Sequence, residues 1–103
     1  MGKLGYAAMP THPGEVVKDE LEARNISQRE FAQRVGISYT ILNEIVNARR
    51  SMSANDALMF EATLGIPADA LMQIQTKYTM QTARRDSRIT DWLKQIGKVA
   101  ALW

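Results

Sequence analysis

The sequence predicts an all-α protein made of five helices and an amphipathic C-terminal helix. Signals that start and stop helices recur along the chain. No stretch sustains the alternation of apolar and polar residues that marks a β-strand. The 103 residues, 46% of them hydrophobic, are enough for one compact domain. We expect a flexible arm over residues 1–11, a helical domain over residues 12–83 and the amphipathic helix over residues 84–103.

The first helix is expected to begin at Pro13, with His12 at the cap position. Proline suits the first helical position because its missing N–H would be unpaired there. The carboxylate of Glu15 can reach back to the cap N–H. His12 and Glu15 also have the spacing of metal ligands, but the helix start accounts for both, so we expect no metal site. Asn25 is expected to end this helix, whose apolar stripe comprises Val16, Val17, Leu21 and Ala23.

The next two helices are each preceded by a capping serine. Ser27 and Glu30 form a capping box for the second helix, which Gly36 ends in the left-handed conformation. Ser38 caps a third helix over about residues 39–47. The apolar residues expected to face inward from this pair are Phe31, Ala32, Val35, Ile37, Leu42 and Ile45.

Similar signals delimit the rest of the chain. Ser53 and Asp56 cap a fourth helix, which stops at Gly65, and Pro67 begins a fifth. The apolar residues of the fourth helix are Leu58, Met59 and Leu64. A break over residues 82–86 precedes the last helix, where apolar residues recur with helical spacing. These are Ile89, Trp92, Leu93, Ile96, Val99 or Ala100, and Trp103.

Residues 27–50 match the physical description of a helix-turn-helix. Two capped helices meet at a glycine turn, and their apolar residues hold them at a steep angle. Gln28 at the start of the second helix is placed to bind phosphate, as are Asn47, Arg49 and Arg50 at the exit of the third. The outward face of the third helix carries side chains that can hydrogen-bond to bases or phosphates, namely Tyr39, Thr40, Asn43, Glu44 and Asn47.

Charge is distributed unevenly along the chain. Residues 1–76 carry seven Lys or Arg and nine Asp or Glu, whereas residues 77–103 carry six and two. The basic C-terminal segment suits a polyanion or an acidic partner, and it equally suits a solvated helix face. The helix-turn-helix spacing favours DNA binding, which requires the acidic residues of the first helix to face away from the DNA. These are Glu15, Asp19, Glu20 and Glu22.

Several function classes are disfavoured by what the sequence lacks. The chain has no cysteine and one histidine, so thiolate chemistry and multi-histidine metal sites are absent. No spacing indicates a catalytic triad, and we expect neither an enzyme nor a cofactor. No apolar run is long enough to span a membrane, and residues 1–10 lack the apolar core of a signal peptide. A cytoplasmic protein is therefore expected.

The residues Gln28, Ala32, Gly36, Ile45 and Asn47 form a pattern that resembles the lambda-repressor-like, XRE-type helix-turn-helix. A longer stretch, from His12 to about Arg85, resembles the HigA-type antitoxins of plasmid-maintenance toxin–antitoxin systems. Its most specific segments lie outside the generic DNA-binding motif. They are HPGE at 12–15, LGIPAD at 64–69 and MQIQTKYTMQTAR at 72–84.

This resemblance implies a homodimer that binds a palindromic operator in double-stranded DNA, represses its own operon and neutralises a HigB-type ribonuclease toxin. It implies that Gln28 contacts phosphate and that Asn47, Arg49 and Arg50 hold the DNA backbone. It also implies a set of residues in the major groove: Ser38, Tyr39, Thr40, Asn43 and Glu44. Two alternatives remain: an autonomous XRE-type regulator without a toxin, and a protein-interaction module that has lost DNA binding.

The chain departs from the family pattern in four places. Leu71 stands where family members often have Trp, and Ala48 stands where they often have Gly, so Ala48 is expected to need a left-handed backbone. Ile41 either touches a thymine methyl or packs on the second helix, and we favour packing. Glu44 repels phosphate, which weakens the case for it as a base reader.

The last helix is the part that the resemblance covers least. Its apolar face either folds back on the domain or contacts a second subunit, or it binds the toxin. The residues concerned are Ile89, Trp92, Leu93, Ile96 and Trp103.

Overall fold

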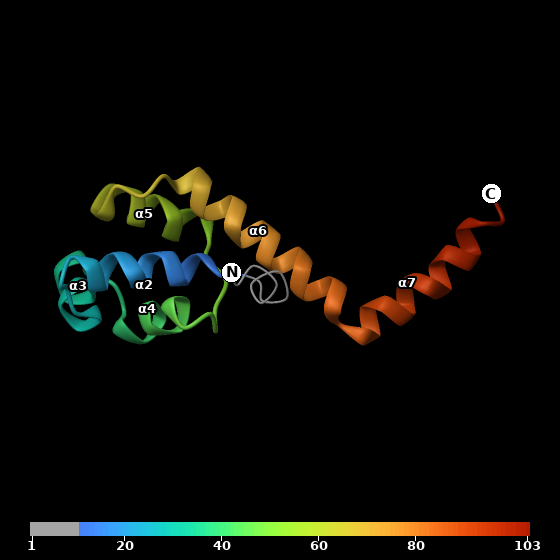
Figure 1. Cartoon of the computed structure of the whole chain (residues 1–103), viewed down its shortest axis with the longest axis horizontal. Helices are drawn as coiled ribbons and strands as arrows, with labels where there is room; N and C mark the ends of the chain where they lie inside the picture. The colour runs from blue at the N-terminus through green and yellow to red at the C-terminus, as the bar shows by residue number, and fades with distance from the viewer. Residues whose placement is uncertain (1–10) are drawn as a thin grey trace, which may run out of the picture. The chain divides into compact units, whose positions relative to one another are not determined.

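The computed structural model describes residues 11–103, so the predicted N-terminal arm lies outside the described residues except for Thr11. All regular structure in this range is helical, and the all-α class is confirmed for it. The chain divides into two units, with the boundary between Thr76 and Lys77 inside one helix. The helices are α2 (Pro13–Ala23), α3 (Gln28–Val35), α4 (Tyr39–Val46), α5 (Ala54–Leu64), α6 (Ala68–Arg85) and α7 (Ser87–Ala100) (Figure 1).

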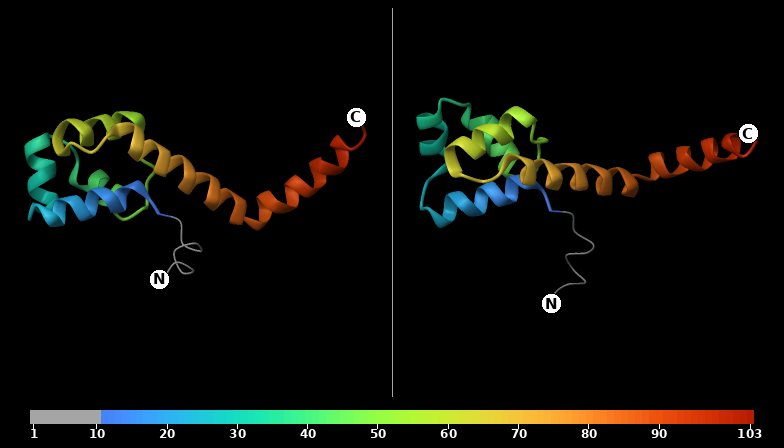
Figure 2. Two further views of the ribbon diagram at one scale, coloured as in Figure 1. Left: turned by 45° about the horizontal axis from the view of Figure 1, so that its top comes forward. Right: turned by 90° about the horizontal axis from the view of Figure 1, so that it is seen from above.

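The unit over residues 11–76 is built around α4, which packs on both α2 and α3. In the left view of Figure 2, α3 runs steeply across the end of α2. The rings of Phe31 and Phe60 stack at 6.1 Å between centroids, which joins α3 to α5. The buried core is formed by Val17, Leu21, Phe31, Ala32, Leu42, Ile45, Val46, Met52, Ala57, Phe60, Leu64, Ala68 and Leu71.

The first turn of α2 is pressed against the end of α4. A methyl group on Gly14 would collide with the backbone carbonyl oxygen of Ile45, so glycine is needed for this close approach. His12 is buried, and its Nδ1 accepts a hydrogen bond from the Gly14 N–H at 2.9 Å. The His12 N–H donates to Oε2 of Glu15 at 3.2 Å, which completes the predicted capping box. Both side chains therefore serve the helix start.

The surroundings of His12 favour the neutral form of its imidazole ring. Burial lowers the pKa of His12 below its ordinary value of 6.5, while a hydrogen bond with the backbone of Arg50 and the charge of Glu15 oppose that shift. Because Nδ1 accepts from Gly14, the ring must carry its proton on Nε2 while it caps the helix. Protonation of Nδ1 would break the cap.

The helix ends follow the predicted serines and glycines, with one difference. Ser27 and Ser38 accept from the backbone N–H groups of Glu30 and Ile41 at 3.0 and 3.2 Å. Gly36 ends α3 with a φ of 84°. The box predicted at Ser27 is only half formed, because the Glu30 carboxylate lies 3.3 Å from the guanidinium of Arg34 instead.

The end of α4 is closed by a left-handed alanine. Ala48 has a φ of 61°, which confirms the prediction for this position. Its N–H donates to the Ile45 carbonyl at 3.1 Å, and the Arg49 N–H donates to the Glu44 carbonyl at 2.8 Å. This pair of bonds is a Schellman motif, which reverses the chain directly after the helix.

The structure defines the buried side of α5 and corrects the start of α6. Leu58, one of the apolar residues named for α5, keeps 55% of its surface exposed, whereas Phe60, which was not named, is fully buried. The helix is apolar on several sides, so periodicity alone did not define its inward face. Helix α6 begins at Ala68 rather than Pro67, and the Pro67 carbonyl accepts the first bond, from Leu71 at 3.2 Å.

A buried polar contact joins α6 to the connection that follows α4. Gln75 is 5% exposed, and its Oε1 accepts from the Met52 N–H at 2.7 Å. A buried backbone N–H without a partner is costly, so this bond secures the chain between α4 and α5. The exit of α4 is thus tied both to α2 and to α6.

Residues 77–103 contain the end of α6 and all of α7. The break predicted over residues 82–86 is confined to Asp86, because α6 continues to Arg85. The Asp86 side chain caps α7 by accepting from the Arg88 N–H at 2.9 Å. No residue of α7 is buried. None of the helices between residues 11 and 103 combines the length and the hydropathy of a membrane span.

Replacing Ala48 by glycine should stabilise the protein. A left-handed alanine costs roughly 1 kcal/mol relative to glycine, so Ala48→Gly should raise the melting temperature by about 4–8 °C in a calorimetric scan. Gly36→Ala is the matched control, because a methyl group there meets open space and only the backbone cost remains. That variant should melt lower. A melting temperature of Ala48→Gly at or below wild type would contradict the account.

The buried His12 should make stability depend on pH. Its pKa is lower in the folded state than in the unfolded chain, so below about pH 6.5 the unfolded state binds more protons and the free energy of unfolding falls. Above that pH the stability should be constant. His12→Asn keeps a side-chain acceptor but does not titrate, so its unfolding free energy should fall less between about pH 6.5 and 5. Equal slopes for the two proteins in urea titrations would refute this.

Candidate nucleic-acid interface

Four residues of the predicted polar face lie on the side of α4 away from its buried residues, namely Thr40, Asn43, Glu44 and Asn47, whereas Tyr39 packs partly against the core. Leu42, Ile45 and Val46 point into the core. Tyr39, Asn43 and Glu44 are half-buried, whereas Thr40 and Asn47 are exposed. Ile41, for which packing was favoured, keeps 39% of its surface exposed and is not part of the core. Helix α4 therefore offers a continuous, mostly polar surface.

This face is connected to the start of α3. The side-chain Nδ2 of Asn43 donates to Oε1 of Gln28 at 3.1 Å. The bond uses the oxygen of Gln28, so its amide nitrogen is the group left to donate to an acceptor such as a phosphate. It also restrains the Asn43 side chain and leaves its Oδ1 oxygen able to accept. Two residues from the predicted set are thus brought together.

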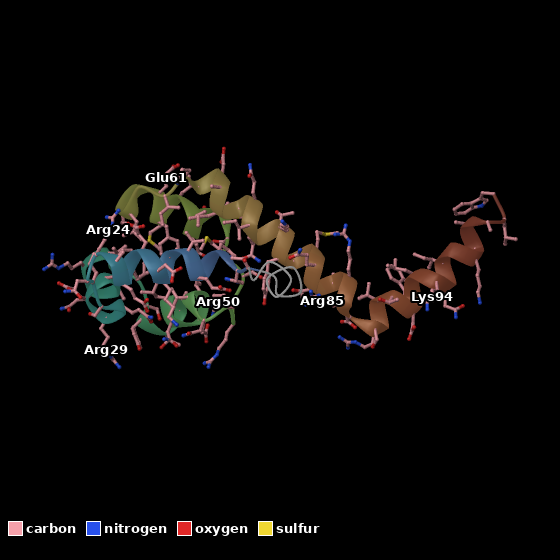
Figure 3. All side chains as sticks on the ribbon, in the orientation of Figure 1. Arg24, Arg29, Arg50, Glu61, Arg85 and Lys94 are labelled. Carbon is pink, nitrogen blue, oxygen red and sulfur yellow. The ribbon has the colours of Figure 1, made fainter. Side chains whose placement is uncertain are left out.

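Arg29 belongs to the same surface, and sequence reasoning missed it. Its guanidinium carbon lies 4.3 Å from the centre of the Tyr39 ring, a cation–π contact that joins α3 to the first turn of α4. Figure 3 shows Arg29 extending along the edge of the domain where α4 lies. Its position beside Gln28 in the first turn of α3 was the feature of the sequence that could have identified it.

The exit of α4 holds two arginines in different states. Arg50 donates through Nε to Oε1 of Glu44 at 2.9 Å, and its second nitrogen lies 2.8 Å from the same oxygen. Arg49 is exposed, and its side chain forms no ion pair within residues 11–103. The amide of Asn47 donates to the Asn43 carbonyl at 2.9 Å, so this side chain turns back onto its own helix.

The acidic residues of α2 lie on its solvent side. Glu15, Asp19 and Glu22 are exposed on the face opposite the buried Val17 and Leu21. Glu20 is half-buried and sits 2.6 Å from Nε of Arg24, whose other nitrogen donates to the Leu64 carbonyl at 2.6 Å. Arg24 is labelled in Figure 3. These carboxylates are directed away from the core that α2 and α4 share.

Four of the predicted partner residues, Ile89, Trp92, Leu93 and Ile96, lie along one face of α7, and the fifth, Trp103, follows the end of the helix. Their exposed fractions run from 37% at Ile89 to 96% at Trp103. Lys94, labelled in Figure 3, stands on the opposite, polar face. The helix is therefore amphipathic, with an apolar side on which no residue is buried. That side comprises Ile89, Trp92, Leu93, Ile96 and Val99.

A family model described as "Helix-turn-helix" matches residues 17–71 of the chain. The matched region contains all of α3, α4 and α5. The chain is 31% identical over 86 residues to virulence-associated protein I of Dichelobacter nodosus, an alignment that covers 82% of this chain and 80% of that protein.

Two solved structures are similar in fold and sequence. The Pseudomonas aeruginosa antitoxin HigA, determined with the higBA promoter, has a TM-score of 0.67 and 33% identity, covering 72% of this chain and 82% of that one. An addiction module antidote protein of the HigA family from Coxiella burnetii has a TM-score of 0.68 and 27% identity, covering 86% and 92%.

Proposed function

Because the chain belongs to the helix-turn-helix family, in its XRE-type branch, we propose that it is a DNA-binding antitoxin that represses its own operon. The observation that carries the proposal is the polar surface of α4, coupled to the start of α3 by the bond between Asn43 and Gln28. The similarity to an antitoxin that was determined with its promoter supports it. The domain that binds DNA is proposed to span residues 12–83.

In this proposal α4 enters the major groove. Thr40 and Asn43, with Ser38 and Tyr39 at the helix start, face base edges, where amide and hydroxyl groups can distinguish base pairs. Gln28 and Arg29 hold one phosphate strand from the start of α3, and Arg49 and Asn47 hold the backbone from the exit of α4. Phosphate contacts then fix the position of the helix, and base contacts select the sequence.

A homodimer is part of the proposal. Two recognition helices related by a two-fold axis can reach successive major grooves about 34 Å apart on a palindromic operator. The apolar side chains of α7 are exposed along one face of the helix, and extended apolar patches on a monomer mark interaction sites. We assign it to contact between subunits, with the toxin as the alternative occupant. The toxin itself is proposed to be a HigB-type ribonuclease.

The second candidate is a protein-interaction module without DNA binding. It is favoured by Glu44, a carboxylate near the centre of the face that would meet the DNA. A titration of duplex DNA from the region upstream of the gene, at several salt concentrations, separates the two functions. A DNA-binding protein gives a complex that salt weakens steeply. A module that has lost DNA binding gives no complex even at low salt.

Two substitutions on the proposed surface should differ in kind. Arg49→Ala removes a phosphate contact, so it should weaken binding to all duplexes and lower the salt slope by about 1 per subunit. Asn43→Ala should instead relax the preference at one base position by about 5- to 100-fold.

Arg34→Ala, at the far end of α3 from Gln28, is the matched control and should leave both properties unchanged. The assignment of the α4 face is wrong if Asn43→Ala binds a randomised duplex pool with wild-type base preference.

The assembly and the antitoxin activity are tested with one pair of α7 variants. Ile96→Asp places a charge on the apolar face and should convert a dimer into a monomer in light scattering. Lys94→Asp changes charge on the polar face and should stay dimeric.

Expression of the small reading frame beside the gene should arrest growth, and co-expression of the wild-type chain should restore it.

A wild-type chain that is monomeric by light scattering contradicts the dimer. If the Ile96→Asp chain remains dimeric but no longer restores growth, the apolar face binds the toxin rather than a second subunit. Absence of arrest, or arrest without rescue, leaves an autonomous regulator that has no toxin partner.

A further inference from the structure

The contact between Glu44 and Arg50 has an uneven geometry. Both guanidinium donors address the same oxygen, Oε1 of Glu44, at 2.8 and 2.9 Å. The second carboxylate oxygen, Oε2, accepts no hydrogen bond from the part of the chain that the structure describes. The Glu44 side chain keeps 35% of its surface exposed, so an acceptor of negative character remains open on the outward face of α4.

The backbone turn at the end of α4 brings Glu44 and Arg50 together. The Arg49 N–H bonds to the Glu44 carbonyl at 2.8 Å, and the left-handed Ala48 allows the chain to turn back there. Arg50 is therefore returned to the side of the helix where Glu44 lies. The backbone of Arg50 also bonds with the buried His12, which anchors the turn to α2.

The pair removes the objection to a carboxylate in the groove. Glu44 lies on α4 one turn beyond Thr40, in the middle of the proposed reading face. An isolated carboxylate there would be repelled by the phosphates on both sides of the groove. With Arg50 bound to Oε1, the charge of the unit is zero, and Oε2 keeps its ability to accept. The base edge that a carboxylate recognises in the major groove is the N4 amino group of cytosine.

We propose that Glu44 and Arg50 form one specificity-determining unit, in which Oε2 of Glu44 accepts from the N4 amino group of a cytosine and Arg50 neutralises the carboxylate. The inference rests on the proposed function, because it requires α4 to lie in the major groove. Arg50 then acts as a positioning residue through Glu44 and not as a phosphate clamp. This role differs from that of Arg49, whose side chain has no ion-pair partner among residues 11–103.

The test is selection from a duplex pool with a randomised core, followed by affinity measurements on the selected duplex. Wild type, Glu44→Gln, Arg50→Ala and the double variant are compared, and thermal melting verifies that each is folded. Wild type should select cytosine at one position per half-site. Glu44→Gln should change that position toward adenine, because an amide pairs with the adenine edge. Placing N4-methylcytosine at the position keeps the N4–H that pairs with guanine and puts a methyl group in place of the major-groove N–H. It should weaken wild-type binding by about tenfold and leave Glu44→Gln unaffected.

The two substitutions should also be coupled. Arg50→Ala exposes an uncompensated carboxylate to the phosphates, so it should weaken wild-type binding by at least about tenfold. In the Glu44→Gln background the same change should cost less than about threefold, as expected for residues that act as a unit. A phosphate clamp would instead give equal losses in both backgrounds, and that result overturns the inference. So does an unchanged base preference in Glu44→Gln.

Failure of the proposed function gives a different result. If wild type selects nothing from the pool and shows no complex at low salt, α4 does not bind DNA and the inference falls with that function. If wild type binds with clear base preference but the effects of the Glu44 and Arg50 substitutions are additive, the DNA-binding function is retained. Only the proposal of a specificity-determining unit is then rejected.

Discussion

The close approach of Gly14 to the carbonyl of Ile45 is the constraint on which the rest of the domain depends. It lets the first turn of α2 lie directly on the end of α4, where any side chain would force the helices apart. His12 reinforces the contact from within, since one ring nitrogen caps α2 and the ring also bonds with the backbone of Arg50. The orientation of α4 and the path of the chain after it are therefore determined by one buried joint. Burial of a neutral imidazole in this joint is favourable only while both nitrogens are partnered.

Charge placement explains how a net acidic segment can present a surface suited to DNA. The carboxylates of α2 stand on the solvent face of that helix, and those nearest to arginines are paired, as Glu20 is with Arg24. Arg29 and Arg49 flank the α4 face from the two ends. Glu44 is the one acidic side chain on that face among residues 11–103, and Arg50 is bound to it. Net charge summed over the segment hides this arrangement, because a binding surface depends on local potential rather than on the total.

Local chemistry made much of the fold predictable. Serine caps, glycine stops and an interruption before the last helix depend on interactions within a few residues. These predictions were confirmed, with the interruption confined to Asp86. Contacts between distant residues were not predictable in the same way. Nothing near Gly14 in the sequence indicates its close approach to the Ile45 carbonyl. The six-residue spacing of Glu44 and Arg50, which crosses a helix end, does not predict an ion pair. Phe60 was missed because α5 has apolar residues on several sides, and its burial depends on packing against Phe31 of a distant helix.

The central claim is that α4, held by the joint with α2, is the surface that meets DNA. The most direct measurement is an NMR titration of the ¹⁵N-labelled full chain with duplex DNA from the region upstream of the gene. The account predicts that amide and side-chain shifts concentrate on Gln28, Asn43 and the exit at Arg49, while the outer faces of α2 and α5 stay unchanged. Shifts confined to α7 or to the acidic face of α2, with α4 unaffected, would contradict it.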